Sequence, residues 1–132
     1  MFLALNSVLL GGRVPWPEFP KLAAKVGYPG VDVMLKPAMQ AGVKATRELL
    51  SELHLKPAAI DLPVEFRKDD AAFKQTLAGL EDSAPFAAAI DCPRMVTYIM
   101  PSSDKPKDEL RRLYKQRFTE IANILALSLI HI

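Results

Sequence analysis

Three polar residues stand inside otherwise apolar runs, and they are the first candidates for chemistry. Asp32 lies between Val31 and Val33, while Asn6 and Asp61 lie in two similar runs. Alternate residues of a strand face opposite sides, so these polar side chains share the side that does not meet packed helices. A carboxylate or amide held there can bind substrate hydroxyls or, with a perturbed pKa, move a proton. The structural alternative is an interior group with a hydrogen-bond partner, and it is the simpler prediction for Asn6 and Asp61.

Three further residues could line the same site. Trp16 precedes a predicted helix, where its ring could wall a pocket or pack onto that helix. Glu65 follows an apolar run and could reach a substrate hydroxyl, although solvation of a loop is the expected role. Tyr98 ends another apolar run and suits either a pocket or a packed layer, with core packing expected.

The composition gives little support to several other classes of function. The 132 residues carry 17 basic and 15 acidic side chains, and a net charge of +2 predicts neither a nucleic-acid partner nor a membrane surface as partner. Cys92 is the one cysteine, so no internal disulfide can form, which favours a reducing, cytoplasmic compartment and a packing role for this residue.

The elements that position these residues alternate between short apolar runs and helical patterns. This alternation indicates an α/β fold of about four βα units with parallel strands and helices packed outside. Four such units in about 126 residues amount to half of a (β/α)8 TIM barrel, whose usual size is about 250 residues. The predicted strands are 3–8, 31–35, 58–64 and 95–100; the predicted helices are 17–26, 41–54, one capped by Asp69 or Asp70 that breaks or restarts at Pro85, and one from about 106 with no strand after it.

Two segments resemble a known superfamily. Residues 17–33, PEFPKLAAKVGYPGVDV, are similar to the first helix and second strand of xylose isomerase-like barrels, the sugar phosphate isomerase/epimerase superfamily, in which Gly-Tyr-x-Gly precedes an apolar residue and an acid. Residues 109–126 are similar to the fourth helix of that family. The resemblance implies the N-terminal half of such a barrel and places Asp32 where the family's acidic residue commonly lines the substrate pocket.

The resemblance also implies a metal-dependent activity for the intact parent protein. Members bind a divalent metal through two Glu, an Asp and a His, and use glutamates to move protons between adjacent sugar carbons. Those ligands come mostly from strands five to eight, so no residue of this sequence matches them. We therefore expect no catalytic residue, no metal ligand and no cofactor in this half. The parent's partner would be a small-molecule sugar or sugar phosphate.

The two ends of the chain carry their own expectations. The apolar start, residues 1–10, lacks a basic leading segment and is interpreted as a first strand. The apolar end is about half the roughly 20 residues that a membrane-spanning helix needs. Residues 127–132, LSLIHI, equal the translation of CTG TCT CTT ATA CAC ATC, the end of a common transposase sequencing adapter. We therefore expect residues 1–126 to be a partial barrel domain, residues 127–132 to be non-native, and a natural homologue to diverge after about residue 126.

Three functions follow as hypotheses. The first is a fragment, itself inactive, of a sugar or sugar-phosphate isomerase/epimerase of carbohydrate metabolism. The second is an endonuclease-type hydrolase on the same barrel, which would need His ligands near the ends of early strands that this sequence lacks. The third is a non-catalytic half barrel that needs a partner and self-associates through its open edge.

Overall fold

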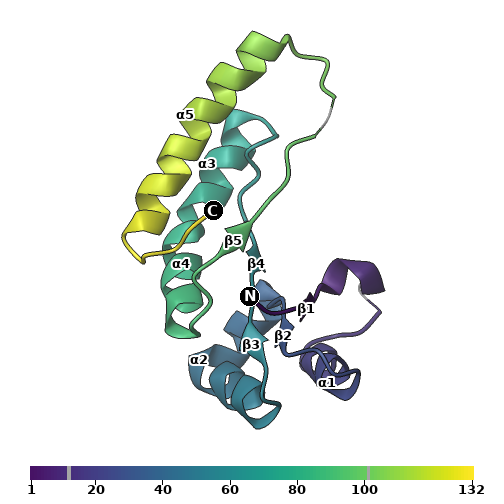
Figure 1. Ribbon diagram of the computed structural model, residues 1–132. Helices are drawn as coiled ribbons and strands as arrows, with labels where there is room; N and C mark the ends of the chain where they lie inside the picture. Colours follow the sequence, from purple (N-terminus) through teal and green to yellow (C-terminus); the bar gives the residue numbers. More distant parts are fainter. Residues whose placement is uncertain (12, 101) are drawn as a thin grey trace.

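The computed structural model describes residues 1–11, 13–100 and 102–132, which form short parallel strands with helices packed against them (Figure 1). The strands are β1 (Ala4–Leu5), β2 (Gly30–Val31), β3 (Lys56–Pro57), β4 (Ile60–Asp61) and β5 (Met95–Val96). The helices are the short 3-10 turn η1 (Ser7–Leu10), α1 (Glu18–Lys25), α2 (Leu35–Glu52), α3 (Asp70–Ala78), α4 (Leu80–Ala89) and α5 (Lys107–Ala126).

The strands pair in chain order and in parallel. β2 lies between β1 and β3, and β4 pairs with β5. The two sheets are joined because the Val33 N–H, just after β2, donates to the Ala59 carbonyl at 2.9 Å. β3 and β4 are thus two parts of one extended segment, and the expected parallel α/β arrangement is confirmed.

The strands are shorter than their apolar runs, and specific residues end them. The first run stops pairing at Leu5 because the Asn6 side chain accepts a hydrogen bond from the Val8 N–H at 2.7 Å and caps η1. The second stops because α2 begins at Leu35. The third pairs over 56–61 instead of 58–64.

Two helix boundaries also differ from expectation. α2 begins earlier than predicted, because a first turn precedes Gly42, whose φ of +88° interrupts the helix. The predicted break at Pro85 is wrong, since Pro85 lies exposed within α4. The junction between α3 and α4 falls instead at Gly79, a residue with low helix propensity.

The apolar side chains form two clusters. The smaller lies beneath α1, around Phe19, Val31 and Leu50. The larger joins β4 and β5 to α2 through α5, and Figure 1 shows α5 running alongside α3 and α4. Trp16 packs against both clusters, so it links the two parts of the core.

A buried arginine ties α5 to the loop after β4. Arg117 is 3% exposed, and its guanidinium donates to the carbonyl oxygens of Phe66 at 2.8 Å and Lys68 at 2.7 Å. It also pairs with the Asp70 carboxylate and lies over the Phe73 ring. Helix α5 therefore anchors the loop of residues 62–69 through the contacts of Arg117.

After α5 the chain turns back along β5. Ile130 is buried, and the His131 N–H donates to the Pro93 carbonyl at 2.9 Å while the His131 carbonyl accepts from the Met95 N–H at 2.8 Å. No strand is expected after α5. The structure instead has an isolated parallel bridge between Arg94 and His131 there. In the part of the chain described, no helix combines the length and the apolarity needed to cross a bilayer.

Replacing Arg117 should destabilise the fold more than replacing another arginine of the same helix. Arg117→Met leaves the Phe66 and Lys68 carbonyls without their donor, so we expect the free energy of unfolding to fall by about 2 kcal/mol. Arg111→Met is the control, because Arg111 is exposed, and it should cost less than about 0.5 kcal/mol. Urea unfolding measures both, and equal losses would contradict the anchoring role of Arg117.

Candidate functional site

Polar residues from different strands meet where the strands end. Asn6 follows β1, Asp61 closes β4, and Thr97 and Tyr98 follow β5. Because the strands are parallel, these carboxyl ends lie at one edge of the sheet. They border a hollow of about 560 Å³, within the size range of small-ligand sites. It is lined by Asn6, Val8, Asp61, Leu62, Arg67, Val96, Thr97 and Tyr98.

Asn6 uses both ends of its amide at this edge. Its Nδ2 donates to Asp32 Oδ2 at 2.7 Å, and its Oδ1 accepts from the Val8 N–H at 2.7 Å. These two contacts fix which way the amide faces. The Asn6 side chain therefore has hydrogen-bond partners within the fold, as the structural alternative predicts, and it also lines the hollow.

Asp32 is half-buried on the side of the strand opposite Val31 and Val33, as alternation predicts. Burial raises the pKa of the Asp32 carboxyl, the hydrogen bond from Asn6 opposes this shift, and the nearby charge of Asp61 adds to it. Asp32 is not among the residues that line the hollow, but it holds Asn6, which is. A carboxylate that is partly removed from water thus lies beside the hollow.

Asp61 and Tyr98 both border the hollow. Asp61 is exposed, whereas its neighbours Ile60 and Leu62 are buried, so the predicted alternation holds here too. The prediction that Tyr98 packs in the core is wrong, because Tyr98 is 66% exposed. β5 ends at Val96, which leaves Tyr98 on the following loop with its polar tip and ring accessible.

Glu65 and Trp16 lie elsewhere. The Glu65 carboxylate forms an ion pair with Lys68 at 3.3 Å on the surface of the loop after β4. Trp16 borders a separate hollow beside α2 and packs against both apolar clusters. Neither residue is brought to the hollow that Asn6, Asp61 and Tyr98 share.

Sequence reasoning missed Arg67 and Thr97. Arg67 belongs to a charged stretch, residues 65–70, that contains acids and bases with no distinctive spacing. The signal that could have singled it out is its place in the loop directly after the third apolar run, since such loops build the sites of parallel α/β folds.

Comparisons with solved structures show which fold this chain shares. A xylose isomerase domain protein from Alicyclobacillus acidocaldarius matches at a TM-score of 0.83 and 21% identity, over 99% of this chain and 48% of that one. The IolI protein, with a bound zinc atom, matches at 0.81 and 16% identity, over 100% of this chain and 50% of that one. The D-psicose 3-epimerase from Clostridium cellulolyticum H10, with D-tagatose, matches at 0.73 and 10% identity, over 98% of this chain and 50% of that one.

The chain has the fold of the N-terminal half of a xylose isomerase-like barrel. It spans about half the length of the solved structures it matches. No protein-family model and no curated protein matches its sequence. The resemblance expected from residues 17–33 and 109–126 is thus confirmed at the level of the fold.

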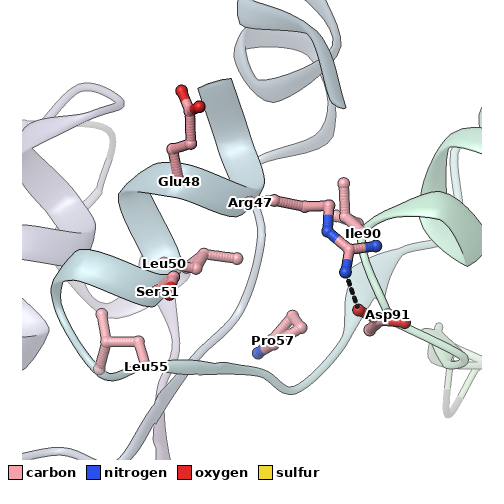
Figure 2. Close-up of a pocket in the computed structure, with 8 residues that line it drawn as sticks. All are labelled: Arg47, Glu48, Leu50, Ser51, Leu55, Pro57, Ile90 and Asp91. Carbon is pink, nitrogen blue, oxygen red and sulfur yellow. Dashed lines mark ion pairs between the residues drawn. The ribbon is translucent and has the colours of Figure 1, made fainter. Parts of the chain in front are cut away.

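The half barrel has another hollow, of about 360 Å³, at the opposite end of the strands (Figure 2). It lies between the end of α2 and the segment after α4, next to Leu55 and Pro57 at the start of β3. Arg47 crosses it, pairing with Asp91 at 3.2 Å and donating to the Ala89 carbonyl at 2.9 Å. In such barrels this end serves stability, so this hollow is interpreted as a structural joint.

The residues of the half barrel do not complete a metal site. Asp32 and Asp61 lie near each other, but no group of three His, Cys, Asp or Glu side chains that could hold a metal ion occurs among residues 1–11, 13–100 and 102–132. Cys92 is buried, and burial raises the pKa of its thiol to about 11, so the thiolate that binds metals or attacks substrates is disfavoured.

The raised pKa of Asp32 predicts how stability changes with pH. The folded state keeps this proton to higher pH than the unfolded state, so ionisation of Asp32 costs stability as the pH rises through its folded pKa. Asp32→Asn stays neutral and keeps an acceptor for Asn6. We therefore expect the variant to be at least as stable as the wild type at pH 7, with the difference vanishing toward acid pH.

Two comparisons sharpen this measurement of unfolding free energy against pH. Asp32→Ala also cannot ionise but removes the acceptor, so it should be about 1 kcal/mol less stable than Asp32→Asn at every pH. Asp104→Asn, at an exposed position, controls for the loss of one carboxylate and should change the free energy of unfolding at pH 7 by less than about 0.5 kcal/mol. A wild type that is more stable than Asp32→Asn at pH 7 would contradict the desolvated setting of this carboxyl.

Proposed function

We propose that this chain is the N-terminal half of a cytoplasmic sugar or sugar-phosphate isomerase or epimerase, which moves a proton next to a carbonyl. One observation carries the proposal: the hollow at the carboxyl ends of the strands is bordered by groups that bind hydroxyls, on a fold whose solved neighbours include sugar epimerases. The lone, buried Cys92 agrees with a reducing compartment.

In this proposal the half barrel binds and orients the sugar. The Asp61 carboxylate accepts hydrogen bonds from sugar hydroxyl groups, the Asn6 amide donates one with its second N–H, and the Tyr98 ring covers an apolar face of the sugar. Asp32 is a positioning residue, because it holds the Asn6 amide in place. Glu65 and Trp16 stay predicted substrate-binding residues. Their loops would have to move for either side chain to reach a ligand in the hollow.

The chemical step belongs to residues outside this half. The IolI structure carries a zinc atom, which supports metal use in the parent protein. The described residues supply two carboxylates and no third ligand, so no step through a metal is assigned to them. We therefore propose that the 132-residue chain is inactive alone, that residues 1–126 are the barrel part, and that residues 127–132 are adapter-derived.

The test is turnover by a complete homologue that contains this half. Asp32→Asn should lower kcat/KM for the sugar at least about 10-fold, because a neutral amide oxygen accepts the hydrogen bond that holds Asn6 more weakly than a carboxylate does. Asp104→Asn, at an exposed loop position, should leave kcat/KM within about 2-fold. Unchanged turnover for Asp32→Asn would remove Asp32 from the site, and absence of any isomerase or epimerase activity on sugars and sugar phosphates would overturn the proposed function.

Exposed apolar residues support a second proposal, that the chain alone self-associates. Leu3 beside β1 is 74% exposed and Val8 is 67% exposed, while Ile99 after β5 is 58% exposed. β1 pairs only with β2 within the described residues, so its outer edge offers free backbone groups. This surface is an open barrel edge with apolar flanks.

Light scattering on the purified chain tests self-association. We expect species larger than a monomer at micromolar concentration. Leu3→Lys with Val8→Lys should shift the population toward monomer, because charges on an edge disfavour edge pairing. A monodisperse wild-type monomer that unfolds cooperatively would contradict the proposal.

A further inference from the structure

Arg67 is held rigidly at the rim of the hollow. Its guanidinium lies 4.4 Å from the centre of the Tyr98 ring and 4.8 Å from that of Phe66. Its Nη1 donates to the Tyr98 carbonyl at 3.0 Å. One hydrogen bond and two ring contacts thus fix the guanidinium plane, while most of its five N–H donors stay available.

The charge of Arg67 has no carboxylate partner in the described part of the chain. Two other arginines that bridge elements are neutralised, Arg47 by Asp91 at 3.2 Å and Arg117 by Asp70. The two acids nearest in sequence have other partners, because Glu65 forms an ion pair with Lys68 and Asp69 accepts from the Ala72 N–H. Arg67 therefore brings a preorganised positive charge to a hollow whose other charged lining residue is Asp61.

We propose that Arg67 binds an oxyanion on the ligand of this hollow, so that the substrate class is a sugar carrying a phosphate or carboxylate group. This proposal rests on the proposed function and narrows it. A guanidinium held by stacking matches the planar, two-point geometry of phosphate and carboxylate oxygens. Asp61 and Asn6 border the same hollow and suit hydroxyl groups, so one ligand with an anionic end and a polyol chain satisfies both sets of residues.

An anion bound by Arg67 would be held more strongly than in an ordinary surface salt bridge. Arg67 is only partly exposed, and its ring contacts lower the entropy lost when it binds an anion. Charge-assisted hydrogen bonds in such a setting raise affinity about 10- to 150-fold.

The experiment is an NMR titration of the 132-residue chain, following the backbone amides of Arg67, Thr97 and Asn6. The probes are D-fructose 6-phosphate, D-gluconate, D-fructose and inorganic phosphate. We expect the phosphorylated sugar or the sugar acid to bind at least about 10-fold more tightly than fructose. Inorganic phosphate should compete weakly, because it lacks the polyol chain.

Matched variants assign the effect to Arg67. Arg67→Met should remove the preference for the anionic sugars, and Arg67→Lys should restore part of it, because lysine keeps the charge but loses the planar contacts. Arg94→Met is the control, since Arg94 lies exposed at the other end of β5 and its side chain donates to the Ala58 carbonyl at 3.5 Å. Circular dichroism confirms that each variant is folded.

The outcomes separate this inference from the function on which it rests. Equal affinity for fructose and fructose 6-phosphate would overturn the oxyanion site and leave a neutral sugar site intact. Equal losses in Arg67→Met and Arg94→Met would show a general charge effect and overturn the assignment to Arg67. Binding of none of the four probes would overturn both the oxyanion site and the sugar site.

Discussion

The Asn6 side chain connects the ends of the first two strands, and the rest of the candidate site depends on that connection. Its amide nitrogen donates to Asp32 after β2, and its amide oxygen accepts from the Val8 N–H. The second contact ends β1 after two residues and turns the chain into η1. The first holds a half-buried carboxylate at the carboxyl end of the sheet. One amide therefore ends a strand and positions a charge.

Helix packing supports the carboxyl edge of the sheet, where the strands share few backbone hydrogen bonds. The strands are short, but Arg117 fastens the loop after β4 to α5, and Phe66 packs against Tyr114 and Phe118 with ring centres 5.4 and 4.8 Å away. Arg67 follows Phe66 directly, so the same anchored loop carries the cation of the hollow. A binding group set on a rigid support loses less entropy when it meets its ligand.

The sequence allowed the parallel α/β arrangement and the alternation of side chains to be predicted. Val31 and Val33 are buried around half-buried Asp32, and Ile60 and Leu62 are buried around exposed Asp61. These predictions succeeded because burial on one face of a strand follows its period of two. The same period accounts for the shared side of the sheet on which the polar residues of the apolar runs lie.

Other features depend on contacts between distant segments and could not be predicted in the same way. Tyr98 is exposed because β5 ends two residues earlier, where its pairing with β4 stops. Arg67 is positioned by contacts with Tyr98, which lies 31 residues further along the chain. Pro85 continues α4 although local propensity favours a break, which is a case of tertiary packing overriding a local preference.

The most direct test of this account is an NMR titration of the Asp32 carboxyl in the wild type and in Asn6→Ala. We expect the pKa of Asp32 to lie above the ordinary aspartate value in the wild type. We expect it to rise further in Asn6→Ala, because the hydrogen bond that favours the charged form is removed. An ordinary pKa in both proteins would show that this carboxyl is fully solvated and not held by Asn6, so that Asn6 would not connect the ends of the first two strands.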